Sequence, residues 1–326
     1  MAHIRGCLAR RKARFLDGDE VKQSTIARPV ECQGLGLHSG AKVRLSLAPG
    51  AADSGIVFIR VGVDCSPAVS EIPARLFSLF SGSRATTLGH PGESGRDAAI
   101  STVEHLLATL YMLSIDNVRI EVNGPEIPAM DGSAAPLVDF VRSAGRAIQG
   151  ALRTPIVLTE AIEIRERDRW IRAEPADRLD ISYTIDFDHP CIGRQTFELA
   201  DLDADRFVRD LASARTFGFA HEVASLRELG LARGGGLENT VVLGEEDVLN
   251  EGGLRFPDEF VRHKVIDLIG DLALLGGPLN AHVRVEKGGH ALHHRLVRAI
   301  ASATPDKLRP RPSYLKEDVV VDSYSQ

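Results

Sequence analysis

Residues 260 to 277, FVRHKVIDLIGDLALLGG, are apolar around almost the whole circumference of a helix, and this stretch constrains the fold more than any other. A helix of this kind is buried on all sides. Among its polar exceptions, His263, Asp267 and Asp271 fall at roughly 0°, 40° and 80° at about 100° per residue and so share one narrow stripe. Gly270 lies beside them and leaves room for a neighbour. Because buried carboxylates must be paired or bound to a metal, the stripe predicts a polar partner inside the core.

The pair His263 and Asp267 has two interpretations. A histidine and a carboxylate at positions i and i+4 stand one above the other on a helix, so they can ligate one metal ion. The alternative is a buried hydrogen bond between the two side chains with no metal, which is the commoner case for an isolated motif of this kind. Two further stretches of the chain bear on the choice.

Length and composition exclude several classes of protein. The 326 residues predict two domains on a prior of about 150 residues each. The 39 basic and 45 acidic side chains give a net charge of -6, so no overall positive field favours nucleic acid, and the low aromatic content of 5% argues against base stacking. The four cysteines are scattered without a CxxC pair, as is typical of a reduced cytosolic protein; they are Cys7, Cys32, Cys65 and Cys191. Since no apolar run approaches about 18 residues and no signal peptide is evident, we expect a cytoplasmic protein without a membrane span.

The chain is expected to divide into four parts, which are a mobile N-terminal extension (1–21), a first α+β domain (22–150), a second α+β domain (151–303) and a C-terminal tail (304–326). The extension is rich in Arg and Lys and has little periodicity. This favours a solvated tail over the alternative, peripheral contact with a membrane surface through Ile4, Leu8 and Phe15.

The stretch STVEHLLATLYMLSIDN, residues 101–117, predicts a second helix. Ser101 and Glu104 match a capping box, which would explain Glu104 without any catalytic role. One face of the helix is apolar, whereas His105 projects nearly opposite to it, beside small and apolar neighbours. We therefore expect a second contact surface on that side, with Glu104 and His105 at the N-terminal end of the helix.

The order of predicted elements repeats along the chain. Before the first helix, alternating or β-branched runs predict strands over residues 26–30, 41–47, 55–63 and 81–88. Each of the two helices described above is followed by a strand, a loop and another helix; the two strands cover residues 118–122 and 280–286. This predicts an α+β fold of two similar domains, each a small β-sheet layered with α-helices, with the active site at the interface between them.

The segment KGGHALHHRL gathers three histidines. His290 follows two glycines, which permit close approach to a ligand, while His293 and His294 are expected to coat a helix surface. His290 and His294 are also spaced to pair as ligands, and composition does not choose among the three. Two other candidates are weak on pattern alone: His38 lies in the glycine-rich turn GLGLHSG, and Thr216 of SARTFGF is either a strand hydrogen bonder or a group that polarises a carbonyl.

Six segments together resemble the UDP-3-O-acyl-N-acetylglucosamine deacetylases of lipid A biosynthesis; they are GLGLHSG, ISTVEHLLATL, IDNVRIEVNGPEIPAMDGSAAP, SARTFGF, LRFPDEFVRHKVIDLIGDLALLG and GGHAL. They stand in the order typical of that family, between residues 24 and 303. The resemblance implies a zinc-dependent cytosolic enzyme whose site lies between two α+β domains. Its substrate would be a nucleotide sugar with an acyl chain, UDP-3-O-(hydroxyacyl)-N-acetylglucosamine, and its reaction the hydrolysis of the 2-acetamido group with release of acetate.

The same resemblance implies a role for individual positions. The zinc ligands match His105, His263 and Asp267, and three ligands leave a position for water, which is typical of a catalytic zinc site. The catalytic residues match Glu104 as general base, His290 as the protonated group that stabilises the oxyanion and delivers a proton to the amine, Asp271 as its orienting carboxylate, and Thr216 as a polarising hydroxyl. The substrate-binding residues match Lys264 near the phosphates and Phe217 in the acyl-chain passage, with Ala220 and Val223 in the same segment. A buried Asp271 is expected to raise the pKa of His290.

Two features depart from the family pattern. About twenty residues precede its usual start, and His293 and His294 stand where other members often have amides, so we assign these histidines no catalytic role. Two other classes of function remain as alternatives. One is a different zinc amidohydrolase that acts on another nucleotide sugar or acyl amide. The other is a non-catalytic protein in which His263, Asp267 and Asp271 form only a buried polar network.

Overall fold

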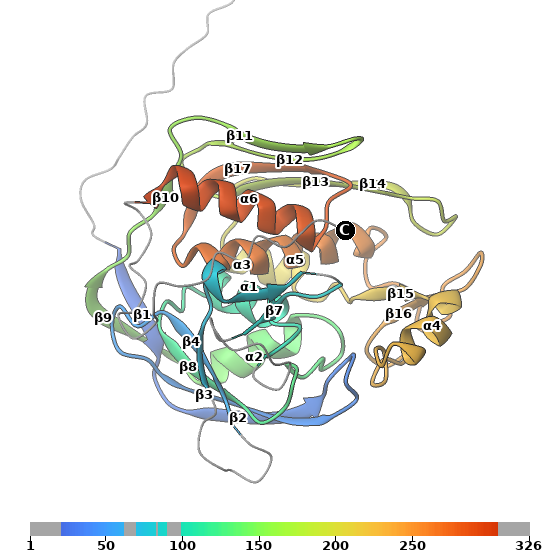
Figure 1. Cartoon of the computed structure of the whole chain (residues 1–326), viewed down its shortest axis with the longest axis horizontal. Coiled ribbons are helices and arrows are strands. Elements are labelled where there is room, and N and C mark those ends of the chain that lie inside the picture. The colour runs from blue at the N-terminus through green and yellow to red at the C-terminus, as the bar shows by residue number, and fades with distance from the viewer. Residues whose placement is uncertain (1–20, 62–69, 83, 90–98, 306–326) are drawn as a thin grey trace, which may run out of the picture.

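The structure is a computed structural model that describes residues 21–61, 70–82, 84–89 and 99–305 (Figure 1). The expected extension up to residue 20, the expected tail from residue 306, and both Cys7 and Cys65 lie outside the described residues. Cys32 and Cys191 are free thiols. Among the described residues, no helix is long and apolar enough to cross a membrane.

Strands and helices alternate in a similar order in the two halves of the chain. The first half contains β1 (Lys22–Ile26), β2 (Val30–Leu35), β3 (Lys42–Pro49), β4 (Ile56–Arg60), β5 (Ser70–Pro73), β6 (Leu79–Ser81), β7 (Thr87–Leu88), α1 (Glu104–Met112), β8 (Val118–Val122), α2 (Ala135–Ser143) and β9 (Arg146–Leu152). The second half contains β10 (Ile156–Val157), β11 (Ile162–Glu166), β12 (Arg169–Pro175), β13 (Asp180–Phe187), β14 (Gly193–Leu199), α3 (Ala204–Arg206), β15 (Phe217–Phe219), α4 (Val223–Glu228), β16 (Val241–Leu243), α5 (Glu259–Leu272), β17 (Leu279–Glu286) and α6 (His290–Ala303).

The two largest sheets have the same topology. Their strand orders are β2-β3-β8-β4-β5 and β11-β12-β17-β13-β14, with β10 beside β17. In both sheets the successive pairs are antiparallel, antiparallel, parallel and antiparallel. In both halves a helix precedes the central strand and another follows it: α1 and α2 flank β8, and α5 and α6 flank β17. This correspondence confirms the predicted α+β fold of two similar domains.

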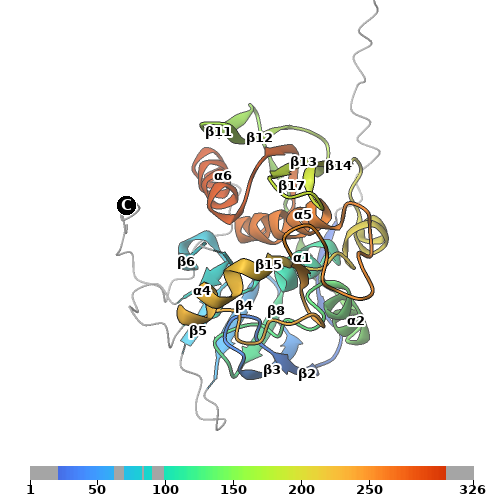
Figure 2. The same ribbon diagram turned by 90° about the vertical axis from the view of Figure 1, so that its right-hand side faces the viewer.

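The sheets form the outside of four layers, and the helices fill the middle (Figure 1). Figure 2 shows from the side that α1 and α5 meet at the centre. They approach so closely that a Cβ atom added to Gly270 of α5 would lie 2.1 Å from the carbonyl oxygen of Glu104 in α1. A glycine at this position is therefore required by the contact between the two halves.

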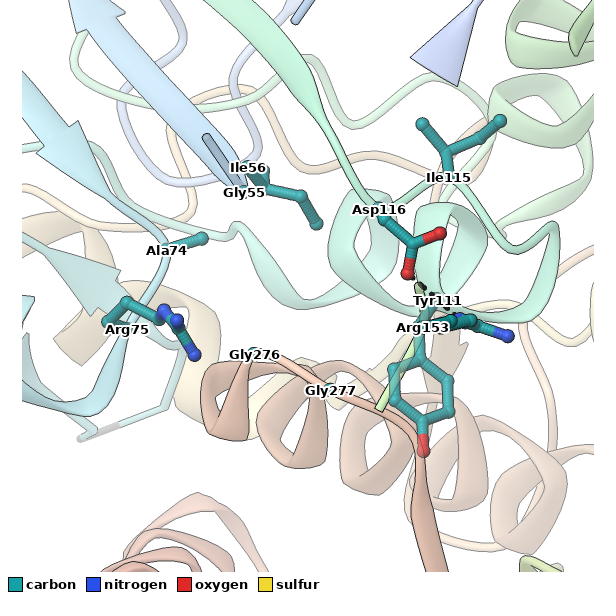
Figure 3. A pocket seen from close by; sticks show the side chains of 10 residues that line it. All are labelled: Gly55, Ile56, Ala74, Arg75, Tyr111, Ile115, Asp116, Arg153, Gly276 and Gly277. Carbon is teal, nitrogen blue, oxygen red and sulfur yellow. Dashed lines mark hydrogen bonds and ion pairs between the residues drawn. The ribbon is translucent and has the colours of Figure 1, made fainter. Parts of the chain in front are cut away.

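The contact surface between the two halves, called the seam below, also includes a cavity of about 30 Å³ that residues of both halves line (Figure 3). Nη1 of Arg75 donates a hydrogen bond of 2.7 Å to the carbonyl oxygen of Leu275, and the backbone N–H of Leu279 donates one of 2.8 Å to the hydroxyl of Tyr111. Gly276 adopts a φ of 76°, and a Cβ atom there would collide with the Arg75 guanidinium. These contacts cross between residues far apart in sequence and hold the two sheets in one arrangement.

Several element boundaries differ from the sequence-based expectation. The predicted strand over 26–30 is wrong as a single element, because the chain bends at residues 27–29 and separates β1 from β2. The predicted strand over 81–88 is also wrong, since β6 ends at Ser81 and β7 begins at Thr87. Strand β1 instead pairs antiparallel with β9, whose alternating exposed residues gave no apolar run to detect.

The helix predicted over residues 101–117 is shorter, because two residues in the left-handed region of backbone conformation flank it. Thr102 has a φ of 55° before its start and Ser114 a φ of 57° after its end. The helix predicted over 260–277 begins at Glu259 and continues past Leu272 as one 3-10 turn.

Candidate active site

Three ligand atoms from two helices form a nearly equilateral triangle at the centre of the seam. The distance between Nε2 of His105 and Nε2 of His263 is 3.2 Å, and each nitrogen lies 3.4 Å from Oδ1 of Asp267. Zinc–nitrogen bonds of about 2.0–2.1 Å in a tetrahedron place ligand atoms about 3.3–3.4 Å apart, so the triangle fits one face of such a site. All three residues are buried. His105 on α1 therefore supplies the partner that the stripe on α5 predicted.

The protonation of His263 suits it for metal binding. Its Nδ1 lies 3.1 Å from the carbonyl oxygen of Ala214, which accepts the N–H of that nitrogen. Burial lowers the pKa of His263 to about 3, so the ring is neutral at neutral pH. Nε2 then carries a lone pair that is available to a metal, as outer hydrogen bonds arrange for metal-bound histidines.

Lys264 binds the oxygen of Asp267 that is not part of the triangle. Its Nζ lies 2.9 Å from Oδ2 of Asp267 and 5.5 Å from the centre of the Phe217 ring. Burial by itself would raise the pKa of Asp267, but the Lys264 ammonium holds it well below its usual range. Asp267 is therefore ionised, and its Oδ1 remains available to a cation.

A buried ion pair positions the segment that supports His263. Glu259, the first residue of α5, accepts hydrogen bonds of 2.9 Å from both the backbone N–H and Nε of Arg215, and Oε2 accepts from Nη2 at 3.2 Å. Glu259 is fully buried and Arg215 nearly so. Since Arg215 follows Ala214 directly, this pair fixes the carbonyl that orients His263.

Glu104 stands beside the triangle at the first turn of α1, but not as a member of a capping box. The predicted capping box is wrong: Val103 occupies the cap position, and Ser101 bonds the hydroxyl of Thr87 instead. The left-handed conformation of Thr102 turns Ser101 away from the helix. Oε2 of Glu104 accepts a hydrogen bond of 3.1 Å from the backbone N–H of Thr86, and burial raises the pKa of the carboxyl.

His290 faces Glu104 from the second half of the chain. Its Nε2 lies 3.6 Å from Oε1 of Glu104 and 3.9 Å from Oδ2 of Asp267, and its Nδ1 lies 2.7 Å from Oδ2 of Asp271. Burial alone would lower the pKa of His290, but Asp271, followed by Glu104 and Asp267, raises it to about 9. The ring is therefore an imidazolium at neutral pH, as the sequence predicted for a histidine beside Asp271.

The prediction that His293 and His294 coat a helix surface is wrong. Both rings are buried and contact Asp271: Nδ1 of His293 lies 2.8 Å from Oδ2, and Nε2 of His294 lies 3.0 Å from Oδ1. Thr86 bonds Oδ1 as well through its hydroxyl. Asp271 is thus surrounded by donors, which together outweigh the effect of burial and hold its pKa well below the usual range.

A cavity of about 390 Å³ opens from these residues toward β15, β16 and α4, the elements that extend from the body of the molecule at the right of Figure 1. Its volume is typical of small-molecule sites. The floor contains His105, His263, Asp267, Glu104 and His290. Away from the floor the wall is largely apolar and includes Phe187, Phe217, Phe219, Val223, Leu226 and Val242.

The remaining candidates predicted from the sequence lie at this cavity with one exception. Thr216, Phe217, Lys264 and Val223 line it, and Ala220 does not. His38 also lines it. The backbone N–H of His38 lies 3.0 Å from both carboxylate oxygens of the buried Glu126, and Nδ1 of its ring has no hydrogen-bond partner among the described residues.

Sequence reasoning missed Thr86, Arg215, Glu259 and Phe187. Thr86 and Phe187 lie in or beside strands whose patterns showed only polar or alternating residues, so no signal marked them. Arg215 and Glu259 lie inside the segments SARTFGF and DEFVRHK that carried the resemblance, but a charge pair separated by 44 residues has no signature in a single sequence.

Comparisons with known proteins agree with this geometry. Residues 23–302 match the family model for UDP-3-O-acyl N-acetylglycosamine deacetylase. Curated relatives described as UDP-3-O-acyl-N-acetylglucosamine deacetylases occur in Myxococcus xanthus (strain DK1622), Anaeromyxobacter sp. (strain Fw109-5) and Oleidesulfovibrio alaskensis (strain G20). They are 47%, 46% and 46% identical to this chain over 280, 278 and 281 residues. The alignments cover 86%, 85% and 86% of this chain and 86%, 88% and 89% of the relatives.

Proposed function

The chain belongs to the UDP-3-O-acyl N-acetylglycosamine deacetylase family, and we propose that its seam is a zinc site that hydrolyses the 2-acetamido group of UDP-3-O-(hydroxyacyl)-N-acetylglucosamine. The products are acetate and the free amine, and the reaction is a step of lipid A biosynthesis in the cytoplasm. The observation that carries the proposal is the triangle of His105, His263 and Asp267 with edges of 3.2, 3.4 and 3.4 Å, placed beside a buried glutamate and an imidazolium.

The residues of the triangle fit zinc by type as well as by distance. Two imidazole nitrogens and one carboxylate oxygen are ligands that zinc takes in catalytic sites. A zinc ion held there would supply a Lewis-acidic centre and a bound water whose pKa falls to about 7.

Glu104 is assigned the role of general base. Its Oε2 is fixed by the N–H of Thr86, so Oε1 is directed toward the space between the triangle and His290. Because burial raises the pKa of the carboxyl, Glu104 accepts a proton more readily than an ordinary glutamate would. The carboxylate takes the proton of the attacking water.

His290 is assigned the role of general acid. Its pKa of about 9 keeps the ring protonated at neutral pH, and Asp271 fixes Nδ1 so that the N–H of Nε2 faces the cavity. This N–H stabilises the oxyanion that forms on the carbonyl oxygen when water attacks the amide carbon, and it then gives its proton to the leaving amine, a poor leaving group without protonation. Thr216, on the wall of the same cavity, is assigned to polarise the carbonyl.

The cavity offers partners of different chemistry to the acyl chain and to the phosphates. The apolar wall around Phe187, Phe217 and Val223 is suited to an acyl chain, and Phe187 packs edge-on against Phe217 at 5.7 Å between ring centres. Lys264 is the cation nearest the triangle on this wall and is assigned to the phosphates, although its ammonium also pairs with Asp267.

The decisive experiment measures turnover and metal content on one sample. Purified protein is assayed with UDP-3-O-acyl-N-acetylglucosamine, its zinc is quantified by mass spectrometry, and both measurements are repeated after chelation and after zinc is added back. We expect about one zinc per chain, loss of turnover on chelation and recovery on addition. A protein that holds zinc but leaves this substrate intact would be a different amidohydrolase, and a protein that holds no metal would have only a buried polar network.

A matched comparison tests the assignment of ligands. Asp267→Asn keeps the size of the side chain but removes the charge of a triangle member, so we expect the metal content to fall. Glu121→Gln changes an exposed glutamate on β8 and is expected to change neither metal content nor turnover. If Asp267→Asn retained zinc and turnover, the triangle would not be the metal site.

A further inference from the structure

The proposed mechanism uses only one of the donors that surround Asp271. This carboxylate is fully buried, and three imidazoles and one hydroxyl contact it. His290 is the proposed acid, whereas His293, His294 and the hydroxyl of Thr86 have no role in the steps above. Burying so many polar groups is costly unless each has a partner, so their arrangement needs an explanation.

The protonation of this cluster follows from hydrogen-bonding chemistry. An ionised carboxylate only accepts hydrogen bonds, so Nδ1 of His290 at 2.7 Å and Nδ1 of His293 at 2.8 Å must both donate to Oδ2 of Asp271. Burial lowers the pKa of His293, so this ring is neutral and its Nε2 carries a lone pair. The hydroxyl of Tyr183, 2.9 Å away, donates to that lone pair. The chain of donors therefore runs in one direction, from Tyr183 through His293 to Asp271.

The cluster is a hydrogen-bonded network and not a second metal site. Asp271, His290 and His293 do bring three potential ligand atoms close together. Their nitrogen-to-oxygen distances of 2.7 and 2.8 Å are those of charge-assisted hydrogen bonds, whereas the ligand atoms of the triangle lie 3.2 to 3.4 Å apart. The two nitrogens also carry hydrogens where a metal would need lone pairs.

Packing leaves the two rings on either side of Asp271 little room to move. A Cβ atom added to Gly288 would lie 2.9 Å from the hydroxyl of Tyr183 and 3.4 Å from Nε2 of His293. A Cβ atom added to Gly82 would lie 2.3 Å from Nδ1 of His294. The network is thus fixed at one end by strand β13, which carries Tyr183, and along its length by helix α6.

We propose that His293 is a positioning residue for the acid His290. By donating from Nδ1 to Oδ2 of Asp271, it holds the carboxylate in the orientation that aims Nε2 of His290 between Glu104 and the triangle. His294 and Thr86 hold the opposite oxygen of the same carboxylate. The inference rests on the proposed function, in which His290 is the general acid.

Two substitutions at one position separate this role from simple packing. In His293→Asn the amide nitrogen replaces Nδ1, so the variant can still donate to Asp271 but does not reach Tyr183. In His293→Gln the longer amide replaces Nε2, so the variant reaches Tyr183 but not Asp271. Each variant keeps one of the two hydrogen bonds of the ring, and the two are expected to have similar melting temperatures.

The readouts are kcat, KM and zinc content with UDP-3-O-acyl-N-acetylglucosamine. We expect His293→Asn to keep kcat within about threefold and His293→Gln to lose about 10- to 100-fold in kcat, with KM within about twofold and zinc unchanged. Equal kcat values for the two variants, a more active His293→Gln, or a change confined to KM would overturn the proposal.

A second measurement covers the case in which a variant does not fold, and it is independent of turnover. Nitrogen-15 NMR of the histidine-labelled, unaltered protein should show His293 as the neutral tautomer with hydrogen on Nδ1. The tautomer with hydrogen on Nε2 would contradict the network. If the unaltered protein were inactive, or if His290→Ala kept full activity, the proposed function would fail; a loss specific to His293→Gln in an active protein concerns the positioning role alone.

Discussion

Glu104→Gln separates catalysis from stability at one buried side chain. Glutamine has the shape of glutamate, and its carbonyl oxygen can accept the N–H of Thr86 as Oε2 does now at 3.1 Å. It cannot accept a proton from water. It also presents an amide where Oε1 now faces Nε2 of His290 at 3.6 Å. The substitution therefore removes the proposed base and one of the charges that keep His290 protonated.

The expected magnitudes follow from these contacts. A positioned general base contributes about 10²- to 10⁴-fold, so kcat should fall by that factor, or by about 2.7 to 5.4 kcal/mol at 1.36 kcal/mol per tenfold. Stability should not fall. Burial raises the pKa of Glu104 in the folded state, so its ionised form opposes folding above the pKa of the unfolded chain, and a neutral glutamine removes that cost. Zinc should stay, because Glu104 is outside the triangle.

The assay combines kcat and KM on the UDP-linked acylated sugar with zinc content and thermal unfolding, and Glu121→Gln on the exposed face of β8 serves as the control. Turnover within tenfold of the unaltered protein would refute the role of base. Loss of zinc would instead make Glu104 a ligand, and a drop in melting temperature of more than a few degrees would show that its charge is structural.

Three further predictions concern the acid, the seam and the buried ion pair. Turnover should decline as pH rises through about 9, because His290 loses there the proton that it donates. Turnover that stays constant from neutral pH to above pH 10 would contradict this. Gly270→Ala should destabilise by about 1–3 kcal/mol or more in urea unfolding, because the new Cβ meets the backbone oxygen of Glu104; at an ordinary helix position the same change would stabilise. Arg215→Met should cost about 3–5 kcal/mol because it leaves the carboxylate of Glu259 buried and unpaired, and adding Glu259→Gln should recover part of the loss; no recovery would mean that the charge pair is not the cause.

The sequence was sufficient for the helices that carry the site, because their information is local. The stripe of His263, Asp267 and Asp271 follows from helical period alone, and all three side chains are buried and paired as expected. The contact of this stripe with His105 is a tertiary property, since the two histidines are 158 residues apart. The family resemblance, and not the pattern, joined them.

The wrong prediction that His293 coats a helix surface could have been avoided from the sequence. Measured from His293 at about 100° per residue, Leu296, Val297 and Ile300 fall at roughly 300°, 40° and 340°, so the histidine stands in the middle of the apolar stripe of α6. Its burial could therefore have been predicted from periodicity. Its contact with Tyr183 could not, because the two residues are 110 positions apart in the sequence and meet only when strand β13 packs against α6.

The failed capping box shows a different limit. Ser101 and Glu104 have the right types and spacing, but Thr102 between them is in the left-handed region, where a β-branched residue is rare. Its hydroxyl donates to Glu126 at 2.8 Å, and Glu126 also binds the turn that contains His38. Strain of this kind is maintained by tertiary contacts and tends to occur at functional sites, so local rules fail where they would be most useful.

The position of the site at the seam follows from the duplicated architecture. A catalytic group must be held to within about 0.5 Å, and neither half can meet this alone, since α1 carries Glu104 and His105 while α5 carries His263 and Asp267. The spacing of the two helices is set by the backbone contact at Gly270, only three residues from Asp267. Burial of nearly every residue of α1 between the sheets makes that spacing rigid. The helix-to-helix contact that stabilises the fold is therefore the same contact that brings the ligand atoms within 3.4 Å of one another.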